Sequence, residues 1–471
     1  MTDTQKTRNG ARMQNLGGAK MSRRRMLKHA GVAGALSTVG RSLLATGGAA
    51  VGSTLAAPAV SRAQEGITLR GIFLPATWGT ITQEVFAKEY EEQTGVKVEI
   101  ELIGRDAIHD KMGTLFVAQD PSYDIFNVDY NWVPEFGRAG HLLAMDDVLA
   151  APETEGDGFL PRALDVARWE DTLYGIPQTV HPHILWYRKD LFEEAGLEPP
   201  ATMQDWRAIV EQFQGTEVEG QEIYGWAAQA ARGFGNVHTW LTFLYSFGGD
   251  AFNYETMEPT LATPEATEGT QFWADMMKFT PPGINDYTYD EVTNDAAAGR
   301  IATCLQWSWG AFAVDDPATS KTVGLWEFVK VPAGTESVPH LAEWVISVSN
   351  YSQHQEEAIK FIQWLENPEN DVRQALLGGG DPVRSSSYEN PELTGAEVEG
   401  FPGLKRFRRY PETLEAMQTT KPRPLFPEEE RWEQVVSVPL HAIQLGEMTV
   451  EEGLAKAQDD VNRMMMELGY Y

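Results

Sequence analysis

Residues 96–102 alternate between apolar and charged side chains, and a period of two places the apolar ones on one face of a strand. A strand-like apolar run covers residues 67–73. Between these two segments, Thr80 and Gln83 stand at the spacing of a helix capping box, and Gly95 is placed to end the helix. The pattern therefore predicts a strand, a helix and a strand from residue 67 onward.

Helical periodicity returns in later segments. Thr202 precedes apolar residues that share one helical face, and Thr449 stands three residues before Glu452 at the start of the last helical segment. Strand-like segments such as residues 123–128 are interspersed with helical segments of about 10–15 residues. This order predicts an α/β protein with largely parallel sheets.

The first 63 residues differ in composition from the rest of the chain. They contain ten of the 38 basic residues and one of the 68 acidic residues. Arg23, Arg24 and Arg25 precede a weakly apolar stretch at residues 30–39, and the second of two small-x-small sequences ends at Ala63. This arrangement resembles a twin-arginine signal peptide, which exports folded proteins. We therefore predict a twin-arginine-type signal peptide at residues 1–63, cleavage after Ala63 and a periplasmic location.

Beyond residue 63 the chain is strongly acidic, with 28 basic and 67 acidic residues and a net charge of about −39. Such a charge repels nucleic acid and disfavours phosphate-rich ligands. Cys304 is the single cysteine, so the sequence predicts no disulfide, no cysteine-rich metal site and no lipid anchor near the cleavage point. We expect a freely diffusing monomer with no cofactor and no nucleic-acid partner.

Two neighbouring sequence motifs carry a family resemblance. Tyr174-Gly175-Ile176-Pro177 is followed at residues 185–197 by the sequence LWYRKDLFEEAGL. Weaker motifs keep the family order at residues 94–99, 298–302 and 446–449. Together these segments resemble extracellular solute-binding protein family 1, the maltose-binding-protein-like group that serves ABC importers of sugars.

The resemblance implies a two-lobed periplasmic binding protein fold of type II, with hinge crossings and a ligand cleft between the lobes. By the family pattern, one lobe comprises residues 66–176 and 306–345, and the other comprises residues 177–305 and 346–471. It also implies a function without catalysis: capture of a small solute, such as a sugar or polyol, and delivery to the transmembrane subunits of an ABC permease.

A sugar presents apolar C–H faces and a belt of hydroxyl groups, so its site needs flat aromatic rings together with charged or amide groups. Tryptophans in expected loops at strand ends supply the rings: Trp78, Trp132, Trp240, Trp307, Trp309 and Trp344. Polar candidates for the same site are Asp129, Asn131, Arg232, Glu343, Asp381 and Arg384. The family resemblance adds His181 and His183, which lie where ligand contacts are common.

Other ligand chemistries remain open from the residues alone. His181 and His183 have the spacing of a metal-binding pair, but the sequence offers no matching third ligand and no His-Glu-x-x-His helix. Aromatic walls and carboxylates would also suit a polyamine, and Arg232 and Arg384 would suit an anionic sugar derivative. A periplasmic glycan hydrolase needs a defined pair of carboxylates, which no motif singles out. The sequence therefore predicts a binding protein with no catalytic residues and no metal site.

Overall fold

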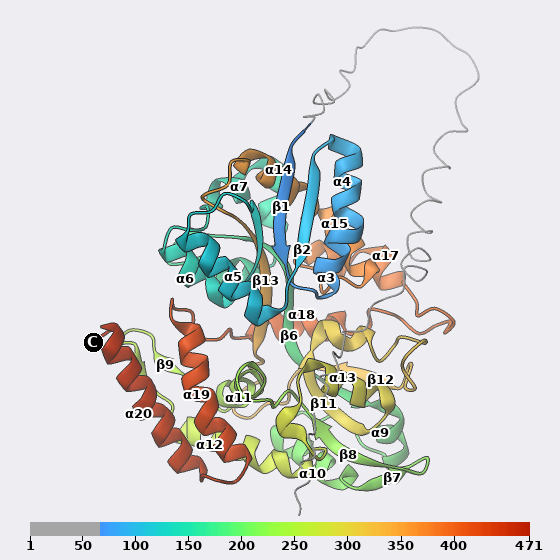
Figure 1. The fold of residues 1–471 in the computed structure, drawn as a ribbon. Coiled ribbons are helices and arrows are strands. Elements are labelled where there is room, and N and C mark those ends of the chain that lie inside the picture. Colours follow the sequence, from blue (N-terminus) through green and yellow to red (C-terminus); the bar gives the residue numbers. More distant parts are fainter. Residues whose placement is uncertain (1–65) are drawn as a thin grey trace, which may run out of the picture. The chain divides into compact units, whose positions relative to one another are not determined.

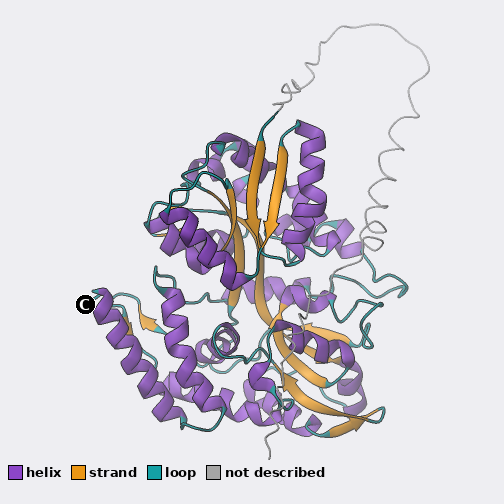
Figure 2. Cartoon of the chain, viewed as in Figure 1, coloured by secondary structure: helices purple, strands orange, loops and turns teal. Residues whose placement is uncertain are grey.

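One long strand, β6 (Ile176–Arg188), belongs to both halves of the fold in the computed structural model, which describes residues 66–471 (Figures 1 and 2). The first part of β6 pairs with β13 (Leu341–Val348), and the second part pairs with β11 (Ile301–Trp307). The predicted signal peptide at residues 1–63 lies outside the described residues. The sheet on each side of this strand is the core of one lobe.

The main sheet has nine strands in the order β2-β1-β3-β13-β6-β11-β8-β7, with β12 also paired to β6. The strands not yet located are β1 (Thr68–Phe73), β2 (Lys97–Leu102), β3 (Ile125–Asp129), β7 (Thr216–Val218), β8 (Gln221–Ala227) and β12 (Trp326–Val329). Two short ribbons are formed by β4 (Arg168–Trp169) with β5 (Thr172–Leu173), and by β9 (Phe252–Asn253) with β10 (Glu258–Pro259).

The predicted opening of strand, helix and strand is confirmed, because β1 and β2 run parallel and are joined by a helical segment that ends at Gly95 in a left-handed conformation. The prediction of largely parallel sheets is wrong. Strand β13 runs antiparallel to both β3 and β6, and β11 and β12 run antiparallel to β6. The sheet is mixed because β6 and β13 lie in opposite directions along the junction between the lobes.

The first lobe is built on a hydrophobic cluster drawn from residues 69–180 and 341–417. Its α-helices are α3 (Thr77–Ile81), α4 (Ala87–Thr94), α5 (Arg105–Val117), α6 (Val133–Arg138), α7 (Asp146–Ala150), α8 (Pro161–Val166), α14 (Gln355–Leu365), α15 (Pro368–Leu377), α16 (Ser385–Tyr388), α17 (Pro391–Gly395) and α18 (Tyr410–Thr419). A π-helical turn at Thr82–Phe86 and short 3-10 turns at Tyr130–Trp132, Pro152–Thr154 and Gly156–Gly158 complete it.

The second lobe is built on a hydrophobic cluster drawn from residues 185–331 and 426–465, with two smaller clusters beside it. Its α-helices are α9 (Lys189–Ala195), α10 (Met203–Phe213), α11 (Phe234–Ser246), α12 (Pro264–Met276), α13 (Tyr289–Ala298), α19 (Glu429–Gln444) and α20 (Val450–Leu468). Short 3-10 turns lie at Met277–Phe279, Ile284–Asp286 and Ser308–Phe312.

These clusters group two segments differently from the predicted lobe boundaries. Residues 306–331 pack in the second lobe, because β11 and β12 pair with the second part of β6. Residues 346–417 pack mainly in the first lobe, where α14 and α15 cover the sheet. The chain therefore passes between the clusters near residues 180–184, 331–341 and 417–426.

Two helix starts read from the sequence are confirmed, and one is wrong. Thr202 caps α10 in a reciprocal capping box with Asp205, and Thr449 caps α20 in the same way with Glu452. Thr80 lies inside α3 instead of capping a helix, and the Gln83 amide donates to the carbonyl of Ile100 at 2.6 Å. None of the helices within residues 66–471 is long and apolar enough to span a membrane.

Gly225 provides a test of the close packing between β8 and α10. A Cβ atom at this position would lie 2.2 Å from the carbonyl oxygen of Val210. We therefore expect Gly225→Ala to lower the free energy of unfolding by about 1–3 kcal/mol through overpacking. Gly113→Ala is the matched control, because nothing lies within 4 Å of its Cβ position and alanine is the better helix former. Urea unfolding of both variants measures the effect, and equal stability of the two would contradict the prediction.

Candidate ligand-binding site

A continuous group of aromatic rings lies where the two lobes meet. Trp78 in α3 contacts His181, Trp309 and Trp344, with ring centroids 5.6, 5.5 and 6.2 Å apart. Trp344 also meets Trp132 edge to face at 5.7 Å. The rings come from both lobes, and we call this group, completed by Trp307 and His183, the aromatic cluster.

Trp307 is placed at the second-lobe end of the aromatic cluster. Its ring centroid lies 3.9 Å from that of His183 and 6.0 Å from that of His181. Trp307 ends β11, and its strand partner in the register is His183 of β6. Alternation along β6 puts Thr179, His181 and His183 on one face of the strand. That face looks onto the junction between the lobes.

The imidazoles at this junction are uncharged at neutral pH. Burial lowers the pKa of His181 and of His183 to about 3. Burial also holds the pKa values of His238 and His340 well below the ordinary value, and Arg423 and neighbouring imidazoles add to this effect. Uncharged imidazoles, which can both donate and accept hydrogen bonds, therefore lie within the aromatic cluster and beside it.

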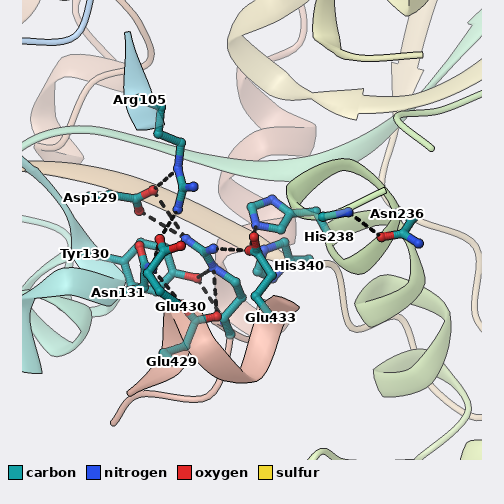
Figure 3. Close-up of polar contacts among 12 residues, drawn as sticks. Arg105, Asp129, Tyr130, Asn131, Asn236, His238, His340, Glu429, Glu430 and Glu433 are labelled. Atoms are coloured by element: carbon teal, nitrogen blue, oxygen red, sulfur yellow. Dashed lines mark hydrogen bonds and ion pairs between the residues drawn. The ribbon is translucent and has the colours of Figure 1, made fainter. Parts of the chain in front are cut away.

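A network of ion pairs bridges the lobes beside the aromatic cluster (Figure 3). Arg423, which is fully buried, donates from Nη2 to the two carboxylate oxygens of Asp129 at 3.2 and 3.3 Å. Its Nη1 donates to Glu433 at 2.6 Å. Asp129 ends β3 in the first lobe, whereas Glu433 lies in α19 of the second. The pairing of Arg423 therefore joins the lobes directly.

Arg105, at the start of α5, makes the second half of this bridge. Its Nε donates to Asp129 at 2.9 Å and its Nη2 donates to Glu430 of α19 at 2.7 Å. Glu430 also accepts from the indole of Trp132 at 2.6 Å and from Asn131 at 3.1 Å. We call Arg105, Asp129, Arg423, Glu430 and Glu433 the interlobe bridge.

Two neighbouring carboxyl groups of α19 have opposite pKa shifts. Burial acts to raise the pKa of Glu430, but the positive charges of Arg105 and Arg423 outweigh it and hold that pKa at about 2. Burial raises the pKa of Glu429 to about 8, and the repulsion of Glu433 and Glu430 contributes to this shift. At neutral pH, Glu430 is therefore ionised, whereas burial and the neighbouring carboxylates favour the protonated form of Glu429.

A cavity of about 490 Å³ adjoins the interlobe bridge. It is lined from the first lobe by His109, Glu135, Arg138 and Ala139, and from the second lobe by Pro427, Glu428, Glu430 and Arg431. Glu430 belongs to both the cavity wall and the bridge. Solvent therefore reaches one end of the bridge through a space bounded by both lobes.

Several buried polar atoms at this junction have no hydrogen-bond partner within the described residues: both ring nitrogens of His238, Nε2 of His340, Nε2 of Gln306, Oδ1 of Asn131 and Oε1 of Glu429. Leaving such a group unpaired costs about 1–3 kcal/mol. Their concentration at one place is typical of a site that a polar ligand completes.

Most of the residues predicted from the sequence lie together at the junction. Those in the aromatic cluster are Trp78, Trp132, His181, His183, Trp307, Trp309 and Trp344. Asp129 and Asn131 contact the interlobe bridge. Asp381 borders the cluster, but both of its carboxylate oxygens are engaged, by Ser308 and by Arg409 at 2.5 Å each.

Three predicted residues, Trp240, Arg384 and Glu343, lie elsewhere. Trp240 is in the core of the second lobe, inside α11 and not in a loop, and its indole donates to Thr270 at 2.8 Å. Arg384 is buried in the first lobe, where it donates to the carbonyls of Thr154, Glu155 and Glu366. The side chain of Arg232 is exposed.

Glu343 points to the face of β13 opposite to its neighbour Trp344, because side chains alternate along a strand. Its carboxyl group is fully buried with both oxygens unpartnered. Burial raises its pKa well above the ordinary value, and Asp165 contributes to the shift. Glu343 is therefore separated from the aromatic cluster by the sheet itself.

The sequence reasoning missed the residues that close the junction: Arg105, His238, Gln306, His340, Arg423, Glu429, Glu430 and Glu433. Most of these belong to segments far apart in sequence, and only the fold brings them together. One signal was available, because Glu429 and Glu433 stand four residues apart and so share a helical face. Within residues 66–471, no group of three or more His, Cys, Asp or Glu side chains is arranged to hold a metal ion.

Two lobes joined by three crossings, with an aromatic and polar site between them, define a two-lobed binding protein. The chain matches the family of bacterial extracellular solute-binding proteins over residues 75–372, and it therefore belongs to that family.

Individual relatives are distant but cover most of the chain. A probable amino-acid ABC transporter periplasmic-binding protein of Sinorhizobium fredii is 26% identical, over 65% of this chain and 70% of the relative. The mannitol-binding protein of Pseudomonas aeruginosa is 23% identical, over 83% of this chain and 91% of the relative. The crystal structure of an ABC transporter solute-binding protein from Agrobacterium radiobacter in complex with ribitol has a TM-score of 0.76 and 22% identity, covering 85% of this chain and 99% of that one.

The low pKa of Glu430 predicts the pH dependence of the interlobe bridge. A carboxyl group with a depressed pKa stabilises the fold above its unfolded value of 4.5, and this contribution is lost as the pH falls toward about 2. The shift corresponds to about 3 kcal/mol at neutral pH. We expect Glu430→Gln to be less stable than the wild type at pH 7 and to lose less stability between pH 5 and pH 2.

Urea unfolding at several pH values gives this difference directly. Glu467→Gln is the matched control, because the exposed pair of Glu467 with Arg431 contributes at most about 1 kcal/mol. Parallel pH profiles of the wild type and Glu430→Gln would show that the bridge does not stabilise the protein.

Proposed function

We propose that this protein captures a sugar or polyol between its lobes in the periplasm and delivers it to the membrane permease of an ABC importer. The observation that carries the proposal is the aromatic cluster at the junction of the lobes, where tryptophan rings alternate with uncharged imidazoles. Such rings can pack on the C–H faces of a sugar or polyol while neighbouring polar groups bind its hydroxyls. Relatives named for mannitol and ribitol binding support the same ligand class.

An uncharged ligand fits this site better than a polyamine or an anionic sugar derivative. The charged groups nearest the rings already pair with one another: Arg105 with Asp129 and Glu430, and Arg423 with Asp129 and Glu433. A charged ligand would have to break one of these pairs to gain a partner, and a buried ion without its partner is strongly unfavourable. Of the two arginines that were candidates for an anion, Arg384 is buried in the first lobe and donates to backbone carbonyls, and the side chain of Arg232 is exposed.

We infer that the protein binds its solute without chemical change. Opposite pKa shifts such as those of Glu429 and Glu430 are found in glycoside hydrolases, whose two carboxyl groups stand about 5–9.5 Å apart. Here, the amide of Asn131 donates to both carboxyl groups, at 2.6 and 3.1 Å, so they lie side by side on one helix. The Glu430 carboxylate also accepts from Arg105 and Trp132, so the carboxylate that hydrolysis would use as base or nucleophile is already engaged within the protein.

Closure of the lobes on the solute provides the mechanism. Rotation of the lobes about the three crossings opens the junction and admits the solute to the aromatic cluster. Closing then buries it and forms the interlobe bridge, in which Arg105 of the first lobe and Arg423 of the third crossing pair with glutamates of α19. Hinge closure of this kind presents a different surface to the permease from that of the open form.

A thermal-shift screen with sugars, polyols, sugar acids and polyamines tests the proposed function. At a hundredfold excess over its Kd, a true ligand stabilises the folded protein by about 2.7 kcal/mol. We expect a neutral sugar or polyol to give this shift, and we expect Trp307→Ala to reduce its affinity by about tenfold or more because a stacking ring is lost.

Trp364→Ala is the matched control for Trp307→Ala. Trp364 packs on Tyr90 in α4, away from the junction, so the variant should melt earlier but bind with unchanged affinity. A response to amines alone, or to none of the uncharged compounds, would contradict the proposed ligand class.

Export is tested at the amino-terminal arginines. We propose that residues 1–63 direct the folded protein through the twin-arginine route. Replacement of Arg23, Arg24 and Arg25 by lysine should therefore retain the protein in the cytoplasm, whereas Arg41→Lys should be exported normally. Cell fractionation with immunoblotting measures the distribution, and periplasmic accumulation of the triple variant would exclude this route.

A further inference from the structure

Three buried side chains near Trp307 have polar atoms with no partner: His238 in α11, His340 just before β13, and Gln306 in β11. All three side chains are fully buried. The rings of His238 and His340 lie 4.6 Å apart between centroids, and they lie 5.5 and 5.6 Å from the ring of Trp307. The two imidazoles lie against a single indole, whereas the side chain of Gln306, which precedes Trp307 on the same strand, points to the other face of β11.

The existing contacts of His340 and Gln306 determine whether each unpartnered nitrogen donates or accepts a hydrogen bond. His340 Nδ1 lies 3.2 Å from the carbonyl oxygen of Lys421, which can only accept, so the ring proton is assigned to Nδ1 and the free Nε2 is an acceptor. The Gln306 carbonyl oxygen accepts from Gln229 at 3.2 Å and from the backbone N–H of Trp307 at 3.0 Å. Its unpartnered Nε2 is therefore a free donor.

His238 supplies one donor and one acceptor. Its pKa is held well below the ordinary value, so the ring is neutral and carries a proton on one nitrogen only. Glu433 lies 3.7 Å from Nε2, beyond hydrogen-bond distance, and its carboxylate is engaged by Arg423 at 2.6 Å. Figure 3 shows His238 and His340 beside Glu433 at the edge of the interlobe bridge.

The free ring nitrogens of His238 and His340 beside Trp307 therefore include one donor and two acceptors. An anion would need donors alone, and an ammonium group would need acceptors alone. A hydroxyl group donates one hydrogen bond and accepts others, so it can satisfy both kinds of atom. Two imidazoles in ring contact can form hydrogen bonds with hydroxyl groups on neighbouring carbon atoms of the ligand, while the indole packs on the C–H face of the ligand.

We propose that His238 and His340 are specificity-determining residues that bind neighbouring hydroxyl groups of an uncharged polyhydroxylated ligand packed on Trp307. This inference rests on the proposed function and assigns its selectivity to particular side chains. It attributes rejection of charged ligands to the mixed donor and acceptor set, and not to the net charge of the protein.

Calorimetric titration of the full mature chain tests the assignment with five probes: ribitol, D-mannitol, maltose, spermidine and glucose 6-phosphate. His238→Phe keeps a ring but removes both nitrogens. His340→Asn keeps a donor for Lys421 but removes the acceptor at Nε2. We expect each variant to weaken binding of the preferred uncharged probe by about 10- to 100-fold, because a buried hydroxyl of the ligand loses its partner. His141→Phe, in the first lobe, is the matched control and should bind like the wild type.

The possible outcomes separate this inference from the proposed function. If an uncharged probe binds the wild type and both variants within twofold, the roles of these histidines are overturned while the proposed function stands. If no uncharged probe binds the wild type, both are overturned. If a variant fails to fold, the wild type labelled with ¹⁵N-histidine decides: the preferred probe should shift the ring nitrogen signals of His238 and His340, assigned with conservative His→Gln variants, and unchanged signals would overturn the proposal.

Discussion

The hydrogen bonds along β6 are the constraint on which the rest of this structure depends. Strand β6 pairs with β13 in the first lobe and with β11 in the second. The sheets of both lobes are therefore fixed relative to the same thirteen residues. Strand alternation then places Thr179, His181 and His183 on one face at the junction. The position of the aromatic cluster follows from this pairing, since Trp307 and Trp344 end up beside that face through their own strand registers.

The interlobe bridge shows how burial and charge balance one another at the junction. Two arginines share four nearby carboxyl groups, and this excess of acid raises the pKa of Glu429 and favours its protonated form, while Glu430 remains ionised. Desolvation alone would make each ion unfavourable, and only the mutual arrangement makes the set stable. These ion pairs tie the geometry of α19 to that of β3 and α5.

Local sequence patterns predicted many of the helices and strands and much of the aromatic cluster. They could not predict which strands and charged side chains pair across the lobes. The capping boxes at Thr202 and Thr449 were recognisable because their signal lies within four residues. Trp240 and Trp307 look alike in sequence, and only tertiary contacts separate a core residue from a junction residue. Arg105 and Glu430 are 325 positions apart, so no periodicity could join them. The lobe boundaries shifted for the same reason: they depend on which part of β6 each later strand pairs with.

The place of α19 after every strand of the main sheet has a consequence for biosynthesis. Arg423 and the three glutamates of α19 are synthesised at least 294 residues after Arg105 and Asp129. A nascent chain that has completed α18 already contains every ring of the aromatic cluster but none of the acidic groups of α19. The ion pairs at the junction thus form only after the whole main sheet has been synthesised, and a product truncated after α18 would possess the rings without the interlobe bridge.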